Sequence, residues 1–184
     1  MRVVAGRFRG TRLEAVAGDK TRPTTDKVKE AMFSMLMPFL SGGNVLDLYA
    51  GTGGLGIEAV SRGMTHATLV DRQFQAIKVI QSNVDKTHDA AAFSILKMPA
   101  QQALQNFVAA QQTFDLVFLD PPYAKETIAA DMQFMAQNGL LADGAIILAE
   151  SNDAANLPEA STQFNIARQK QYGITVVTIY QFDK

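Results

Sequence analysis

Five short, continuously apolar runs recur along the chain, and a longer stretch of different character separates each run from the next. The runs lie at about 45–49, 67–71, 93–96, 115–119 and 145–149. They are too short and too apolar for surface helices, whereas the stretches between them have helical periodicity. Those stretches lie at about 54–63, 73–86, 100–110 and 125–137. This alternation predicts an α/β fold with a mostly parallel sheet that helices cover on both faces.

The two ends of the chain depart from this alternation. Residues 2–16 alternate weakly between polar and apolar and contain two glycines, which predicts a small N-terminal β-hairpin. Residues 164–171 and 174–182 are β-prone and are joined around Tyr172-Gly173. They predict an antiparallel C-terminal hairpin at the edge of the sheet.

Between the N-terminal hairpin and the first apolar run, the sequence predicts one further helix. Thr24 or Thr25 can cap its start, and Pro38 with Ser41-Gly42-Gly43 ends it. A length of 184 residues suits one domain with a small appendage. We therefore expect a basic extension over residues 1–20 and one catalytic domain over residues 21–184.

Composition excludes several classes of protein. The chain has 47% hydrophobic and 19% charged residues, which is typical of a globular protein. It has no cysteine, so disulfides, thiolate zinc sites and cysteine nucleophiles are excluded, and we expect no metal site. No apolar segment follows the basic N-terminus, so we expect no signal peptide, and the longest apolar run is too short to span a bilayer. We expect a cytoplasmic monomer with no membrane partner.

Charge is distributed unevenly along the chain. Residues 1–30 carry eight Lys and Arg against four acids, although the whole chain has a net charge of −1. A basic end on an acidic body indicates a polyanion bound at one edge, with a solvated terminus as the alternative. The candidate RNA-binding side chains are Arg2, Arg7, Arg9, Arg12 and Arg22.

A strand, a glycine-rich turn and the start of a helix run from Val45 to Gly56. The glycines at 51, 53 and 56 have the spacing G-x-G-x-x-G, and Asp71 ends the next strand 20 residues after Gly51. By spacing alone this is a dinucleotide-binding pattern. Glycines let a ligand approach the backbone, and the acid can accept two ribose hydroxyls. Because NAD and S-adenosylmethionine both carry such a ribose, the loop leaves both open.

Asp47 favours the second ligand. It ends the first strand, where a dinucleotide would place its pyrophosphate against the helix N-terminus. Like charges about 4 Å apart repel by about 4 kcal/mol at an effective dielectric of about 20. S-adenosylmethionine instead carries a cationic amino group and a sulfonium, so it is the expected cofactor, with S-adenosylhomocysteine as product. The alternative is that Asp47 caps the loop.

The segment Asp120-Pro121-Pro122-Tyr123 follows a buried strand directly. Ligands of open α/β sheets bind at the carboxyl ends of the strands. The prolines fix the backbone and leave carbonyl acceptors, which suit the two N–H groups of an exocyclic amino group on a base. Tyr123 offers a ring on which an extruded base can stack, and these four residues are the candidate catalytic residues. The alternative is a Pro-Pro pair that only ends a strand.

These motifs, spread over nearly the whole chain, resemble one known family, the bacterial small-subunit ribosomal RNA guanine-N2 methyltransferases. The pieces that carry the resemblance are Met1-Arg2-Val3-Val4-Ala5-Gly6, Arg9-Gly10, Arg22-Pro23-Thr24-Thr25-Asp26, Val45 to Gly56, Gly63, Asp71-Arg72 and Asp120-Pro121-Pro122-Tyr123. The Asp-Pro-Pro-Tyr motif is shared with adenine-N6 methyltransferases of DNA, whereas Arg-Pro-Thr-Thr is more specific to this family.

The resemblance implies a seven-stranded, Rossmann-like class I methyltransferase fold. It also implies transfer of a methyl group from S-adenosylmethionine to N2 of one guanine of 16S rRNA, at position 966, in a partly assembled subunit with ribosomal proteins as partners. The N-terminal hairpin would grip the rRNA, and Arg22 would lie near the mouth of the active site. An acid that often reads the cofactor adenine is missing after the third strand, where Ala100 or Gln101 would take its place. The candidate cofactor-binding residues are Asp47, Tyr49, Ala50, Gly51, Gly53, Asp71, Arg72, Ala100 and Gln101.

Three rival functions stay open at this point. Adenine-N6 methylation of DNA or RNA would use the same motif, although the chain has no sizeable second domain to read a DNA sequence. A NAD-dependent oxidoreductase would use the glycine loop alone. A non-catalytic RNA-binding module would use only the basic hairpin.

Overall fold

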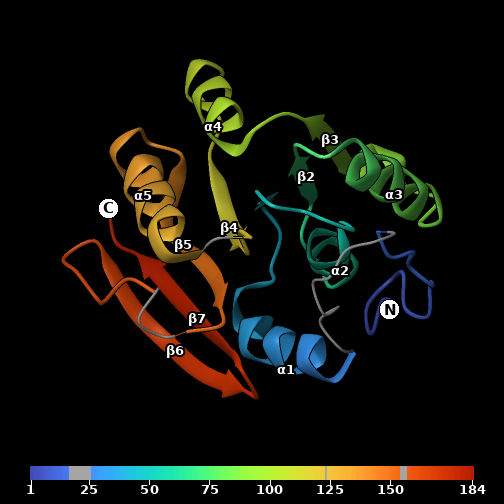
Figure 1. Cartoon of the computed structure of the whole chain (residues 1–184), viewed down its shortest axis with the longest axis horizontal. Helices are drawn as coiled ribbons and strands as arrows, with labels where there is room; N and C mark the ends of the chain where they lie inside the picture. The colour runs from blue at the N-terminus through green and yellow to red at the C-terminus, as the bar shows by residue number, and fades with distance from the viewer. Residues whose placement is uncertain (17–25, 123, 154–156) are drawn as a thin grey trace. The chain divides into compact units, whose positions relative to one another are not determined.

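Helices and strands alternate through most of the chain, as the apolar runs predict (Figure 1). The computed structural model describes residues 1–16, 26–122, 124–153 and 157–184. In chain order its elements are α1 (Asp26–Leu36), η1 (Met37–Phe39), β1 (Asn44–Asp47), α2 (Gly54–Ser61), β2 (His66–Asp71), α3 (Phe74–Asp85), η2 (Ala90–Ala92), β3 (Phe93–Lys97), α4 (Ala100–Ala109), β4 (Phe114–Leu119), α5 (Ala124–Gln137), β5 (Leu141–Ser151), β6 (Phe164–Tyr172) and β7 (Thr175–Phe182). The chain divides into two compact units.

The first unit, Met1–Ala100, is built on three parallel strands in the order β3-β2-β1. Helices α2 and α3 pack against these strands (Figure 1). The last residue of β2, Asp71, is in register with Lys97, the last residue of β3. Because the strands are parallel, their carboxyl ends lie along one edge of the sheet, where ligands bind in folds of this class.

The second unit, Gln101–Lys184, has four strands in the order β4-β5-β7-β6. Strands β4 and β5 are parallel, whereas β7 is antiparallel to both β5 and β6. The predicted C-terminal antiparallel hairpin is therefore confirmed. Strand β5 is longer than its apolar run because it pairs with β4 on one side and with β7 on the other.

The N-terminal segment, residues 1–14, forms the predicted hairpin in a reduced form. Arg2 and Arg12 make a single antiparallel bridge. The Val3 amide donates to the Thr11 carbonyl at 2.9 Å, and no longer strand forms because the chain turns toward α2. Gly6 permits this turn at φ +83°, and a Cβ there would lie 1.9 Å from the Ser61 carbonyl oxygen.

Some expected features fall outside the described residues: the caps at Thr24 and Thr25, the boundary between residues 20 and 21, and the positions of Arg22 and Tyr123. Among the helices that the structure does describe, none is both long and apolar enough to cross a membrane.

Candidate active site

The glycine loop joins β1 to α2 in a tight turn at the carboxyl end of its strand. Gly53 lies just before α2 at φ +76°, a left-handed conformation that favours glycine. Its amide donates to the Ala50 carbonyl at 2.7 Å, and the Ala50 amide donates to the Val70 carbonyl of β2 at 2.9 Å. The loop is therefore fixed to two strands and one helix before any ligand binds.

Asp47 closes this turn from inside. Its side chain is nearly completely buried, and Oδ2 accepts a hydrogen bond from the Gly56 amide at 3.1 Å. This contact holds the first turn of α2 against the end of β1. It is the loop-capping role that the sequence analysis named as the alternative for Asp47. A carboxylate at this depth also places a negative charge beneath the loop, which suits a cationic ligand better than a pyrophosphate. Contact between Asp47 and the cofactor stays a prediction.

Asp71 ends β2 beside the opening of the loop. Its Oδ2 accepts from the Gly51 amide at 3.0 Å, and its Oδ1 accepts from the Gln73 amide at 2.8 Å. Each carboxylate oxygen can accept a second hydrogen bond, so both can still receive ribose hydroxyls. A Cβ on Gly51 would meet no atom within 4 Å, so there is room for a ligand against the backbone. These residues fit the ribose of S-adenosylmethionine.

An aromatic ring that the sequence analysis did not single out lies close to Asp71. Phe74 is 53% exposed at the start of α3. The ammonium groups of Lys78 and Lys97 lie 4.5 and 5.1 Å from its ring centroid. Of the predicted cofactor-binding residues, Tyr49 is half-buried and Arg72 is exposed. The ring of Phe74 is a candidate surface for stacking a base.

The two residues expected to read the cofactor adenine lie at the start of α4. Ala100 is half-buried, and Gln101 is exposed. The Gln101 Nε2 donates to Oδ1 of the fully buried Asp131 in α5 at 2.7 Å. Because this amide group already has a partner, the backbone of Ala100 is the better candidate for contact with adenine.

The Asp-Pro-Pro segment leaves the carboxyl end of β4. Asp120 is exposed, Pro121 is buried and Pro122 is exposed. Strand β5 runs beside it, and burial raises the pKa of Glu150 in that strand to about 8, with a further contribution from the charge of Asp120. An exposed carboxylate therefore has a buried carboxyl group as its neighbour.

The four arginines of the N-terminal segment are exposed, and two of them make ion pairs. Arg2 pairs with Asp26 at 3.2 Å, and Arg7 pairs with Asp89 at 2.9 Å. Arg9 and Arg12 are exposed and make no ion pair with the described residues.

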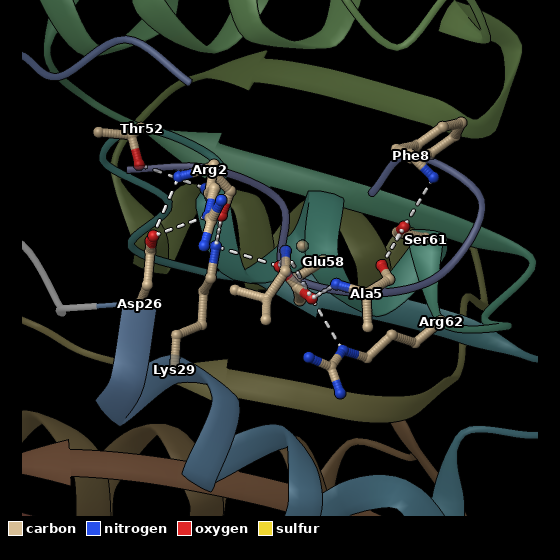
Figure 2. Close-up of polar contacts among 12 residues, drawn as sticks. Arg2, Ala5, Phe8, Asp26, Lys29, Thr52, Glu58, Ser61 and Arg62 are labelled. Carbon is tan, nitrogen blue, oxygen red and sulfur yellow. Dashed lines mark hydrogen bonds and ion pairs between the residues drawn. The ribbon is translucent and has the colours of Figure 1, made fainter. Parts of the chain in front are cut away.

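Glu58 of α2 fixes the N-terminal segment to the protein (Figure 2). The fully buried Glu58 carboxylate accepts from the amides of Val4 and Ala5 at 2.9 and 3.0 Å. Lys29 Nζ lies 3.1 Å from Oε2, and Arg62 Nε lies 2.8 Å from Oε1. The Lys29 ammonium group also donates to the Arg2 carbonyl oxygen. Glu58 and Lys29 therefore hold the segment directly, whereas Arg62 holds the Glu58 carboxylate.

A second contact connects the same segment to the glycine loop. The fully buried Asn83 of α3 accepts from the Glu14 amide at 2.7 Å through Oδ1. Its Nδ2 donates to the carbonyls of Glu14 and Thr52 at 3.1 and 2.9 Å. One amide side chain therefore bridges the N-terminal segment and the cofactor loop.

Comparison with known proteins agrees with this arrangement. Residues 1–181 match the family described as Conserved hypothetical protein 95. The chain belongs to this family. It is 41% identical to the "Putative rRNA methyltransferase YlbH" of Bacillus subtilis, over 98% of each chain. It is 31% identical to the "Ribosomal RNA small subunit methyltransferase D" of Escherichia coli, over 98% of this chain and 89% of that one.

A solved structure supports the same assignment for the fold. The "Putative methyltransferase yhhF from Escherichia coli" has a TM-score of 0.85 and 31% identity, over 100% of this chain and 98% of that one. The predicted α/β Rossmann-like class I methyltransferase fold is confirmed. The relatives are named methyltransferases, which agrees with the predicted cofactor, S-adenosylmethionine.

Four residues of this member of the Conserved hypothetical protein 95 family escaped the sequence analysis: Glu58, Phe74, Asn83 and Glu150. Glu58 did carry a signal, since it is the only charged residue of α2, whose other residues are small or apolar. The contacts of Asn83 and Glu150 come from segments far apart in the sequence, and nothing local indicates them.

Proposed function

We propose that the protein transfers a methyl group from S-adenosylmethionine to the exocyclic N2 amino group of one guanine in 16S rRNA. The observation that carries the proposal is the Asp120-Pro121-Pro122 segment at the carboxyl end of β4, in a chain whose relatives are named ribosomal RNA methyltransferases. Guanine 966 in a partly assembled small subunit is the specific target we propose.

The first unit supplies the cofactor side of this proposal. When bound, S-adenosylmethionine supplies an electrophilic methyl group on a sulfonium. Asp71 would accept the ribose hydroxyls, and the open backbone at Gly51 would let the ligand approach the loop. Phe74 and the backbone of Ala100 would hold the adenine, and Tyr49, Ala50, Gly53 and Arg72 are the other residues we propose for the cofactor site. Asp47 holds the loop in shape and favours positive charge above it.

The second unit supplies the amino-group side. The amino nitrogen of guanine is a weak nucleophile because its lone pair is delocalised into the ring. Hydrogen bonds from its two N–H groups to the Asp120 carboxylate and the Pro121 carbonyl favour a pyramidal nitrogen, and Tyr123 stacks on the base. Once the amino nitrogen has taken the methyl group that bound S-adenosylmethionine would supply, Asp120 or solvent would accept the proton that the nitrogen loses.

The N-terminal segment supplies the grip on rRNA in this proposal. Exposed guanidinium groups of Arg2, Arg7, Arg9 and Arg12 lie on a segment fixed by buried contacts, so they form a pre-arranged surface for phosphates. Arg22 would contact the base-binding side. Small-subunit ribosomal proteins would complete the docking surface, and the protein would act as a cytoplasmic monomer.

Mass spectrometry of nucleosides tests the proposal directly. Small-subunit rRNA from a strain lacking this protein should lack one N2-methylguanosine, and restoring the protein should restore it. Restoration with Asp120→Ala should leave the rRNA unmodified. Appearance of N6-methyladenosine instead would favour the adenine alternative, and unchanged rRNA in the deletion strain would contradict both.

A further inference from the structure

Glu150 lies beside the Asp-Pro-Pro segment through strand pairing. Leu119, the last residue of β4, is in parallel register with Ala149 of β5. The next residue on each chain is Asp120 and Glu150, so both carboxyl groups sit at the carboxyl ends of two adjacent parallel strands. On its other side Glu150 is in register with Val177 of β7.

The side chain of Glu150 lacks the partners that a buried carboxylate needs. Its Oε2 atom is buried and accepts no hydrogen bond within the described part of the chain. The charged neighbour that acts on it is Asp120, which has the same sign, and Lys170 of β6 lies opposite Val177 beyond the adjacent strand. Burial first, and the Asp120 charge second, raise the pKa of Glu150 to about 8. Near pH 7 this group is therefore mainly a neutral acid.

We propose that Glu150 is a positioning residue for methyl transfer: its neutral carboxyl group donates a hydrogen bond to Asp120 and holds that carboxylate toward the substrate amino group. The inference rests on the function proposed above and adds a residue that neither the motif nor the family resemblance includes.

Two physical consequences support this role. A neutral Glu150 offers the O–H donor that an adjacent carboxylate can accept, and such charge-assisted bonds fix geometry well. With one shared proton, the pair presents a single negative charge to the substrate. Loss of that proton would put two carboxylates side by side, and their repulsion would turn Asp120 away from its aligned position. The neutral state of Glu150 is then required for turnover.

The test uses the whole protein and small subunits from the deletion strain as substrate. Methyl transfer is measured from pH 6 to 9 for wild type, Glu150→Gln and Glu150→Ala, with kcat and KM obtained separately. Glu159→Gln is the matched control because Glu159 is an exposed carboxylate in the same unit. Thermal shift with S-adenosylhomocysteine checks that each variant is folded and binds the cofactor product.

We expect the kcat of wild type to fall as pH rises through about 8. Glu150→Gln keeps a donor, so it should hold kcat within about threefold of wild type at pH 7 and lose that fall. Glu150→Ala should lower kcat by about tenfold or more with KM for the subunit unchanged. A Glu150→Gln profile that superimposes on wild type, or full kcat in a folded Glu150→Ala, would overturn the inference. If wild type modifies no guanine at any pH, the proposed function fails and this inference fails with it.

Discussion

Glu58 in the first unit is fully buried and Glu150 in the second has a buried Oε2 atom, yet their surroundings are opposite. Glu58 accepts from two backbone amides and pairs with Lys29 and Arg62, so its charge is compensated on every side. The Oε2 of Glu150 has no hydrogen-bond partner in the described residues, and its charged neighbour is another carboxylate. The first arrangement serves structure, since all its bonds end within the protein. In the second, the Glu150 carboxyl group can still form a hydrogen bond, and it lies next to Asp120 of the candidate site.

Removing the charge of Glu58 should produce the largest effect. Glu58→Gln keeps the shape of the side chain but leaves Lys29 and Arg62 buried without a counter-charge. We expect the free energy of unfolding to fall by about 3–5 kcal/mol, as is typical when one partner of a buried ion pair is removed. Urea denaturation measures this change. Glu30→Gln on the exposed face of α1 is the control and should change little.

A double-mutant cycle sharpens the same point. Lys29→Met removes the positive charge that lies against Glu58. The free energy of unfolding should therefore fall less in the double variant Lys29→Met, Glu58→Gln than the sum of the two single losses. Losses that simply add would mean that Glu58 and Lys29 do not act as a compensated pair, and the contrast with Glu150 would disappear.

The stability of the protein should depend on pH through Glu150 in a defined direction. Its pKa is about 8 when folded and close to 4.5 when unfolded, so between these values the folded state holds one more proton than the unfolded state. Stability therefore falls as pH rises through this window, by about 1.4 kcal/mol per pH unit. Between pH 6 and 7.5 wild type should lose about 2 kcal/mol relative to Glu150→Gln, which cannot ionise.

Urea denaturation of both proteins at the two pH values checks this prediction. The difference between wild type and Glu150→Gln isolates the one group, because every other titrating residue is common to both. Glu159→Gln should follow the wild-type slope. Parallel pH dependence in wild type and Glu150→Gln would mean that Glu150 is already ionised near neutrality, and its setting would then resemble that of Glu58.

The same contrast explains which features the sequence predicts. Local apolar periodicity predicts the alternation of strands and helices. The Asp120-Pro121-Pro122 segment is a contiguous motif, so it could be predicted as well. Glu58 meets Val4 across 54 residues, and Glu14 meets Asn83 across 69. The position of Glu150 beside Asp120 depends on strand register. Such contacts exist only in the folded chain. The same is true of the hydrogen bond from the Gln101 side-chain amide to Asp131.

The smallest effects should come from the exposed arginines of the N-terminal segment. Arg9 and Arg12 make no ion pair with the described residues, whereas Arg2 and Arg7 are each paired with an aspartate. Replacing Arg9 and Arg12 with Gln should leave the free energy of unfolding within about 0.5 kcal/mol of wild type, because no buried contact is lost.

RNA binding should respond where stability does not. Each phosphate contact to a single strand contributes about 0.7 to the slope of log K against log salt concentration. The Arg9→Gln, Arg12→Gln variant should therefore show a slope reduced by about 1.4 if both guanidinium groups contact phosphates. The Arg2→Gln, Arg7→Gln variant is the matched comparison, and it should lose less because those side chains must first leave Asp26 and Asp89. An unchanged slope for the Arg9→Gln, Arg12→Gln variant would mean that rRNA is held elsewhere. The segment, anchored by Glu58 and Asn83, would then serve only the stability of the protein.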